Sequence, residues 1–479
     1  MHARLTMVFS ALLLSACAMG PNFQRPTPPA TADYTPAQQP RTTATAEGES
    51  GGAQHFIAGG AMPQRWWELF QCEPLDSLVH EALAHNPTVL EARARLREAQ
   101  EDLTAQSRGT LYPRFDAQLG VTRQKLDPAA FGITAIPAEP PFTLYNAQVN
   151  VSYTLDLFGA NRRMLEGVRA QTEYQAYETE AAQLTLAANV VSAAIRQADL
   201  QAQIEDTEQI IEAQSGQVSI SEARYRAGGV SLEDLNNQRT QLAQLRAALP
   251  GLQAQRQQLD HQLAVYTGKA PAEAAIPRFR LQDLKLPADV PLTLPSELVR
   301  ARPDVRASEA LWHQAAANVG VATANLFPRL TISGYAGSDR TDASQLANSL
   351  NVWSIGATLL QPIFHAGELR AKKRSAAAAY EAAAQAYEQT VLESLQQVAD
   401  SLRALEADAL TLQARASAFG QSSATYAIAQ QRFAAGGISE FSLLDVQRQQ
   451  LQALADRNHA EAQRYADTAA LLHALGGTL

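Results

Sequence analysis

The stretch between Tyr145 and Leu157 alternates without interruption between apolar and polar side chains. A period of two predicts a β-strand with one apolar and one polar face. The apolar side carries Tyr145, Ala147, Val149, Val151, Tyr153, Leu155 and Leu157. The polar side carries Asn146, Gln148, Asn150, Ser152, Thr154 and Asp156. Most of the remaining chain has a helical pattern, so the sequence shows no second sheet that could cover the apolar side.

The chain repeats itself once. LYPRF at 111–115 returns as LFPRL at 326–330, and RYRAGGVS at 224–231 returns as RFAAGGIS at 432–439. The period is far too long for a solenoid and indicates a single duplication. Each half contains two strand candidates joined by a loop, at about 115–123, 145–157, 330–336 and 351–360.

Long stretches without proline follow each pair of strand candidates, from 142 to 249 and after Pro362. A helix over 160–227 would be about 100 Å long at 1.5 Å per residue. Between Tyr380 and Phe419, apolar residues recur every three or four positions, which predicts coiled-coil packing. We therefore expect long helices at about 160–227, 231–267, 367–435 and 440–475.

Both halves contain a glycine pair where the long helix should end, Gly228-Gly229 and Gly436-Gly437. Glycine just beyond a helix suits a left-handed C-terminal cap. Ser231 and Ser439 follow as N-cap candidates, and Asp234 completes a capping-box spacing after Ser231. Each half is therefore predicted to end in a tight hairpin of two antiparallel helices.

The beginning of the chain, MHARLTMVFSALLLSAC, has one arginine, an apolar run and small residues before Cys17. This pattern predicts a signal peptide over 1–16, and the LSAC lipobox predicts a lipidated Cys17. Residues 17–61 have no hydrophobic periodicity and are predicted to form an extended tether. The first repeat then covers 62–270 and the second 304–479, with a proline-rich linker at 271–303. Cys72 is the only other cysteine, so the mature chain has no cysteine pair for an internal disulfide.

The formal charge of −9 excludes a broadly basic surface for nucleic acid. No run of 18 or more apolar residues follows the signal, so we expect no transmembrane helix. The segment HEALAH at 80–85 has its two histidines one residue too far apart for a zincin. No nucleotide-binding loop, Cys/His cluster or nucleophile elbow occurs, so we expect no enzyme activity, metal or cofactor.

If the strands cross a membrane, the four strands of one chain are too few to form a closed barrel. Transmembrane barrels begin at about eight strands, and open sheet edges are not tolerated in lipid. Several copies would have to pool their strands, eight from two copies or twelve from three. The polar side of 145–157 would then face a wet lumen. The lipid-facing residues would be Tyr145, Val149, Val151, Tyr153 and Leu155.

The start CAMGPNFQRP at Cys17, the WWELF segment at 66–70, the duplicated LYPRF and LFPRL, and the paired RYRAGG and RFAAGG occur in this order. Together they resemble the outer-membrane efflux proteins, the TolC-like channel-tunnel family, in its lipoprotein branch of the OprM and NodT type. The resemblance implies a mainly α fold with a small β part. Three copies would form a transmembrane barrel of twelve strands, continued by a tunnel of long helices.

The resemblance also implies a function and partners. The homotrimer would be the outer-membrane exit duct of a tripartite efflux pump, anchored by lipid at Cys17 and extending into the periplasm. A periplasmic adaptor would join it to an inner-membrane transporter, for which we expect the resistance-nodulation-division class. The cargo would be drugs or other small molecules, conducted passively through a duct that is gated at its periplasmic tip.

Functional residues carried over from the family lie at the two hairpin tips. The adaptor-docking residues would be Ala227, Gly228, Gly229, Ala435, Gly436, Gly437 and Ile438. Asp445 would form a ring of acids that narrows the aperture and attracts cations, and Asp234 would help to link neighbouring copies. Ser442 and Ala434 stand where relatives can carry a second acid and an arginine, so fewer links would hold the closed state.

Two other classes of protein compete with this interpretation. A coiled-coil envelope scaffold would explain the lipobox and the heptads, but it does not need duplicated strand pairs with polar faces. A duct for type I protein secretion would share the fold, and only the lipobox favours the small-molecule branch over it.

Overall fold

The structure is a computed structural model that describes residues 18–36, 41–60, 62–125, 132 and 140–476. It divides into two compact units. The strand unit comprises Leu96–Gln175, Ser308–Tyr387 and the described part of Met1–Arg25. The hairpin unit comprises Ala176–Ala307, Glu388–Leu479 and Pro26–Arg95, as far as they are described. Because the duplicated halves contribute to both units, each unit brings residues of the two repeats together.

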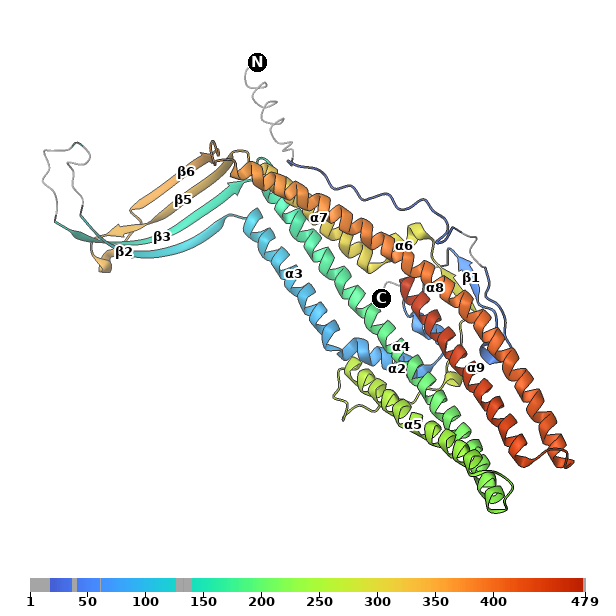
Figure 1. The fold of residues 1–479 in the computed structure, drawn as a ribbon. Helices are drawn as coiled ribbons and strands as arrows, with labels where there is room; N and C mark the ends of the chain where they lie inside the picture. Colours follow the sequence, from blue (N-terminus) through green and yellow to red (C-terminus); the bar gives the residue numbers. More distant parts are fainter. Residues whose placement is uncertain (1–17, 37–40, 61, 126–131, 133–139, 477–479) are drawn as a thin grey trace. The chain divides into compact units, whose positions relative to one another are not determined.

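The strand unit contains an antiparallel sheet of β2 (Arg114–Gln124), β3 (Phe142–Leu155), β5 (Arg329–Arg340) and β6 (Val352–Leu360) in the order β2-β3-β5-β6 (Figure 1). The central pair β3 and β5 joins the two repeats. Among the described residues, β2 and β6 have no further strand beside them and are the edges of the sheet.

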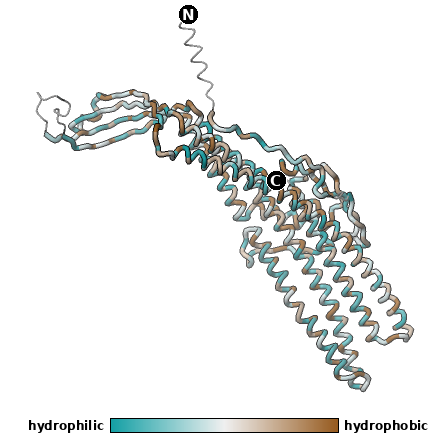
Figure 2. The backbone as a smooth tube through the Cα atoms, turned by 45° about the horizontal axis from the view of Figure 1, so that its top comes forward, coloured by the Kyte–Doolittle hydropathy of each residue, from teal (hydrophilic) through white to brown (hydrophobic). Residues whose placement is uncertain are grey.

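The helices match the predicted pattern of two long antiparallel pairs. The first pair is α4 (Ala160–Arg226) with α5 (Leu232–Tyr266), and the second is α8 (Glu368–Ala434) with α9 (Glu440–Ala474). Brown and teal alternate along these helices in Figure 2, as apolar positions three or four residues apart require. The shorter helices are α2 (Glu73–His85), α3 (Pro87–Leu111), α6 (Pro295–Ala301) and α7 (Pro303–Ala324). Short 3-10 turns occur at η1 (Glu49–Gly51), η2 (Trp66–Phe70), η4 (Leu281–Asp283) and η5 (Ala343–Gln345).

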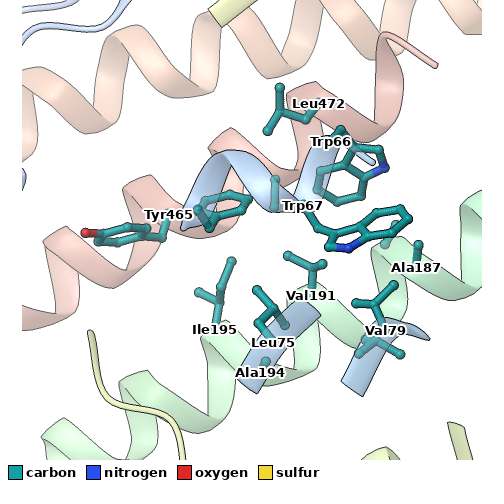
Figure 3. Close-up of a cluster of buried hydrophobic side chains, with 14 of the residues drawn as sticks. Trp66, Trp67, Leu75, Val79, Ala187, Val191, Ala194, Ile195, Tyr465 and Leu472 are labelled. Atoms are coloured by element: carbon teal, nitrogen blue, oxygen red, sulfur yellow. The ribbon is translucent and has the colours of Figure 1, made fainter. Parts of the chain in front are cut away.

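The core of the hairpin unit forms where η2 and α2 pack against the middle of α4 and the end of α9 (Figure 3). Trp66 and Trp67 are fully buried there, with their rings edge to face at 6.2 Å between centroids. Their neighbours in the cluster are Leu75, Val79, Val191, Ile195, Tyr465 and Leu472. The WWELF segment is therefore a packing element of the hairpin unit.

Three strand ends differ by more than one residue from those predicted, and the first is the start of β3, which lies at Phe142 rather than 145. β3 ends at Leu155 because Asp156 turns away and accepts the backbone N–H groups of Asn161 and Arg162, at 3.1 and 2.9 Å. This places its carboxylate at the positive end of α4. β5 runs to Arg340 rather than 336, because its polar end still pairs with β3, Arg340 lying opposite Tyr145.

The N-terminal segment is more than the extended tether expected over 17–61. β1 (His55–Ala58) pairs in parallel with β4 (Asp289–Leu292), inside the proline-rich linker. The guanidinium of Arg464, on α9, is buried and donates to this segment. Its acceptors are Thr43 Oγ1, the carbonyls of Ser50 and Gly52, and Gln54 Oε1, at 2.8–3.2 Å.

Candidate functional site

The register of the sheet gathers apolar side chains on one face of all four strands. Directly opposed residues in antiparallel strands share a face, and Val151 lies opposite both Phe115 and Gly334. The face continues on the two edge strands, where Leu119 is 82% and Trp353 76% exposed. Its apolar members are Phe115, Ala117, Leu119, Val121, Tyr145, Ala147, Val149, Val151, Tyr153, Leu155, Leu330, Ile332, Ala336, Trp353, Ile355, Ala357 and Leu359. Polar residues join this side only at the end of the sheet where β3 begins, namely Arg123, Thr143, Ser338 and Arg340.

The opposite face is mostly polar, and its side chains contact one another across the strands. Asn150 Nδ2 lies 3.4 Å from Gln118 Oε1, and Thr154 Oγ1 lies 3.2 Å from Thr331 Oγ1. Gln148 donates to Asp339 at 3.3 Å. The five predicted lumen residues within β3 all lie on this face, namely Asn146, Gln148, Asn150, Ser152 and Thr154. Asp156 lies one residue beyond the strand, at the start of α4.

So large an exposed apolar face on a single chain indicates a contact surface. Contiguous apolar patches of several hundred square ångströms mark membrane or protein contacts. No helix among the described residues is long and apolar enough to cross a membrane. In the same part of the chain, no group of three or more His, Cys, Asp and Glu side chains is placed to hold a metal ion.

The first hairpin tip is closed by a glycine cap. The N–H of Gly229 donates to the carbonyl of Arg224 at 2.8 Å, and that of Gly228 to Tyr225 at 2.9 Å. These are the paired bonds of a Schellman motif, and Gly228 has the left-handed φ of 74° that the motif needs. Ala227, Gly228 and Gly229 are all exposed at this turn.

The second tip repeats the geometry. Gly437 donates to Arg432 at 2.7 Å and Gly436 to Phe433 at 2.9 Å, with a φ of 72° at Gly436. Ala435, Gly436 and Gly437 are exposed, and Ile438 is half-buried. The two tips thus present short side chains and accessible backbone, which lets a partner's backbone approach closely.

The acids next to the tips have different surroundings. Asp234 closes a capping box, because its Oδ2 accepts from the backbone N–H of Ser231 at 3.3 Å while Ser231 Oγ accepts from the Asp234 N–H at 3.0 Å. Ser439 caps α9 alone, accepting from the Ser442 N–H at 3.1 Å. Asp445 lies on the second turn of α9 and is half-exposed. Arg448 and Gln449 both donate to it at 2.9 Å.

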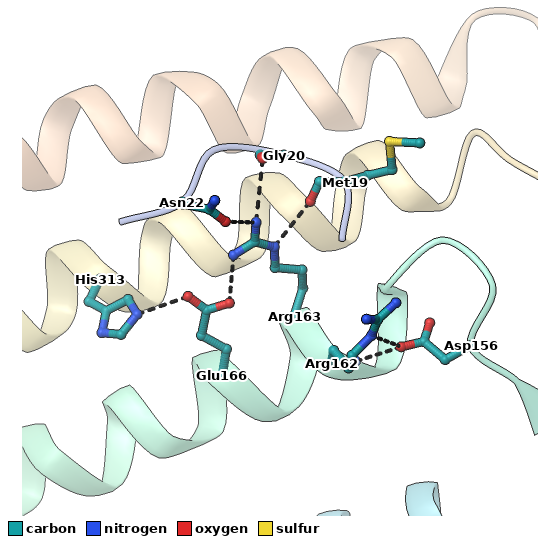
Figure 4. A network of polar contacts seen from close by, with 8 residues as sticks. All are labelled: Met19, Gly20, Asn22, Asp156, Arg162, Arg163, Glu166 and His313. Carbon is teal, nitrogen blue, oxygen red and sulfur yellow. Dashed lines mark hydrogen bonds and ion pairs between the residues drawn. The ribbon is translucent and has the colours of Figure 1, made fainter. Parts of the chain in front are cut away.

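Cys17 lies outside the described residues, but the segment that follows it is held on the strand unit (Figure 4). The buried side chain of Arg163, on α4, donates to the carbonyls of Met19 and Gly20, to Asn22 Oδ1 and to Glu166, at 2.6–3.4 Å. Burial tends to raise the pKa of Glu166, but hydrogen bonds from Arg163 and His313 outweigh it and leave this pKa below its usual value. Residues 18–22 are therefore fixed beside α4.

A pair of acids within the hairpin unit was not singled out by sequence pattern. Asp408 on α8 shares a hydrogen bond with Asp467 on α9, and one oxygen of Asp408 is buried without any other partner. Burial, then the hydrogen bond and the negative charge of Asp467, raise the pKa of Asp408 to about 7, although Arg464 opposes the change. Cys72 is buried, and burial raises the pKa of its thiol, which disfavours the reactive thiolate.

Comparison with known proteins agrees with this arrangement. The family model described as "Outer membrane efflux protein" matches residues 78–269 and 294–477. The chain is 28% identical to the pyoverdine export outer membrane protein OpmQ of Pseudomonas putida, over 87% of this chain and 89% of the relative. It is also 28% identical to the toluene efflux pump outer membrane protein TtgC of Pseudomonas putida, over 93% and 89%. The solved outer-membrane channel OprN superimposes with a TM-score of 0.82 at 28% identity, covering 96% of this chain and 99% of that one.

Gly228→Ala should loosen the first tip, because an alanine there must adopt the left-handed conformation. The penalty of about 1 kcal/mol corresponds to roughly fivefold faster hydrogen exchange in the last turn of α4. Gly229→Ala is the matched control, since the Cβ added there meets the Arg224 carbonyl at 3.4 Å, an ordinary contact. Equal protection in Gly228→Ala and wild type would contradict the cap.

Asp408→Asn should remove a pH dependence of stability. The raised pKa means that the folded chain binds a proton more tightly than the unfolded chain, so stability falls as the pH rises from about 4 through about 7. The amide can donate to Asp467 at every pH, so the variant should melt at a higher temperature than wild type at pH 8 but not at pH 5. Melting curves in detergent measure this. Asp400→Asn, on the same helix and exposed, should follow wild type; a wild-type pH profile in Asp408→Asn would refute the shared proton.

Proposed function

Because the chain belongs to the outer membrane efflux protein family, we propose that it serves as the exit duct of a tripartite efflux pump. The observation that carries this proposal is the four-stranded sheet, which has one apolar face, one polar face and two free edges among the described residues. An apolar outer face and a polar inner face, alternating along each strand, are what a water-filled barrel in an outer membrane needs.

The copies assemble as a homotrimer. Four strands per chain give twelve in three copies, which exceeds the roughly eight strands of the smallest transmembrane barrels. Two copies would give only eight, a number whose interior is filled by side chains. Twelve strands leave space for a solute, and the lumen is then lined by the polar face of β3, from Asn146 to Thr154. Tyr145, Val149, Val151, Tyr153 and Leu155 face lipid.

A lipid anchor at Cys17 holds the trimer in the outer membrane. The lipobox before Cys17 supports this, as does the fixed position of residues 18–22 on α4. Met19 donates to the carbonyl of Phe158, three residues after the end of β3, so the segment reaches the same end of the strand. Acyl chains attached there would enter the leaflet next to the barrel.

The hairpin tips receive the periplasmic adaptor. Their exposed glycines and alanines, from Ala227 to Gly229 and from Ala435 to Ile438, allow close backbone approach and leave the turns without bulky side chains. The adaptor connects the duct to an inner-membrane transporter of the resistance-nodulation-division class, which supplies the energy. The duct itself conducts passively.

Asp445 narrows the aperture. Three copies of this half-exposed acid around one axis would repel one another and would attract cations. Its bond to Arg448 reduces but does not cancel this charge, because a partly exposed pair is weak. Asp234 already forms a hydrogen bond with Ser231. A link from Asp234 to a neighbouring copy therefore has to share or replace the hydrogen bonds of the capping box.

The cargo is a small molecule. OpmQ is described as a pyoverdine export protein and TtgC as part of a toluene efflux pump, so members of the family export quite different small compounds. The polar face carries Asn, Gln, Ser and Thr side chains together with Arg114, Asp116, Arg329 and Asp339 of each chain. Because these charges are two of each sign, this face has no excess charge with which to select one solute over another.

Single-channel conductance in a planar bilayer tests the duct and its gate together. Wild type should insert and conduct weakly, and Asp445→Ala should conduct more, because the ring of acids at the aperture and its bonds to Arg448 and Gln449 are removed. Asp456→Ala is the control, since this acid lies further along α9 and pairs with Arg415 on α8. Inserted protein that never conducts would contradict the duct, whereas equal conductance in wild type and Asp445→Ala would contradict the gate alone.

A further inference from the structure

The loop between β6 and α8 exposes two large apolar side chains. Ile363 is 94% and Phe364 85% exposed, more than most large apolar residues on the sheet itself. The loop then turns sharply through Ala366 and Gly367, whose φ values of 47° and 85° are both left-handed. A non-glycine residue in that region is strained, so Ala366 marks a sharp turn directly after the exposed apolar pair. Such a pair needs a partner surface.

The first repeat shows how the equivalent loop is covered. Phe158 follows β3 and stacks on Phe327, which precedes β5, with 4.9 Å between ring centroids and 19° between planes. β3 and β5 are neighbours in the sheet, with Leu155 opposite Leu330. β5 begins beside the end of β3, so the aromatic residue after β3 contacts the aromatic residue before β5.

The duplication places corresponding aromatic residues next to the two free edges of the sheet. Phe364 lies four residues after the end of β6, where Phe158 lies three after the end of β3, and Tyr112 precedes β2 in LYPRF as Phe327 precedes β5 in LFPRL. Tyr112 is also uncovered, with 66% of its surface exposed. β6 and β2 lie at opposite edges of the sheet of one chain. Within that sheet Phe364 and Tyr112 therefore do not flank neighbouring strands.

We infer that Phe364 and Ile363 of one copy pack on Tyr112 and Leu111 of the next copy, forming an aromatic seam at the base of each junction between copies. This inference rests on the proposed pooling of strands and adds the residues that hold neighbouring copies together. β6 of one copy pairs antiparallel with β2 of the partner subunit, and Leu359 takes the place of Leu155, opposite Phe115 of the partner subunit.

The predicted register keeps apolar residues of one copy opposite apolar residues of the next. Continuing from Leu359, it sets Ala357 opposite Ala117, Ile355 opposite Leu119 and Trp353 opposite Val121 of the partner subunit. All of these belong to the apolar face of the sheet. A slip by one residue would put apolar side chains opposite polar ones on the wrong face. The contact within the chain between Phe158 and Phe327 is the template for the seam, and the loop that carries Phe364 has two more residues, counted from Leu359, with which to reach Tyr112.

Cysteine pairs in the full-length protein in its membrane test the seam. Tyr112→Cys with Phe364→Cys is treated with dibromobimane, a short reagent that fluoresces once both ends have reacted with thiols. Phe158→Cys with Phe327→Cys is the positive control and should become fluorescent as a monomer. Ala117→Cys with Ala357→Cys reports the register independently. The single variants and wild type, whose Cys72 is buried, give the background.

The seam predicts fluorescent dimers and trimers on denaturing gels for Tyr112→Cys with Phe364→Cys, and their loss in each single variant. If Ala117→Cys with Ala357→Cys links copies but the Tyr112 and Phe364 pair does not, the seam is wrong, and the two side chains face lipid, while the pooled barrel stands. If neither pair links copies although the control reacts, the pooled barrel and the seam both fail.

Substitutions of Phe364 test its packing without any cysteine probe. Phe364→Ser should lower the temperature at which the oligomer dissociates in detergent, and Phe364→Trp should not. Leu157→Ser, in the corresponding loop of the first repeat, is the control and should leave that temperature unchanged. An unchanged dissociation temperature in Phe364→Ser would overturn the seam.

Discussion

The unpaired edges of the sheet constrain everything else in this molecule. Every backbone N–H and C=O group on the outer sides of β2 and β6 needs a partner, because a polar group left unsatisfied in lipid costs several kcal/mol. Among the described residues, the two other strands, β1 and β4, pair with each other and not with these edges. The apolar side chains of β2 and β6 are mostly exposed. Closure by other copies, as proposed above, would pair the open edges and place the apolar face against lipid.

The duplication makes closure geometrically simple. Because β3 and β5 join the repeats inside the chain, the same kind of junction can recur between copies, with β6 meeting β2. Each repeat also carries one long helical hairpin with the same glycine cap, so the two tips of the chain are equivalent. The deviations between repeats are local. Ser231 is part of a complete capping box, whereas Ser439 is followed by Ser442 and has only half of one.

Much of this architecture could be predicted from the sequence because its signals are periodic or repeated. The strict alternation from Tyr145 to Leu155 identified β3 and its two faces, and the glycine pairs identified both hairpin turns. What was missed has no local period. The pairing of β1 with β4 joins two four-residue segments far apart in the chain, one of them containing Pro291. The binding of the N-terminal segment by Arg163 and Arg464, and the pairing of Asp408 with Asp467, likewise depend on contacts between distant residues that no short motif encodes.

The number of copies that share one sheet is the quantity on which the account depends most directly. Native mass spectrometry of the full-length protein, released from lipid nanodiscs, counts the copies without any substitution or probe. The account predicts a single species of three chains that survives dilution, since its edges are closed by backbone hydrogen bonds. A monomer that remains inserted in the bilayer would contradict it, because the edges of β2 and β6 would then be open in lipid.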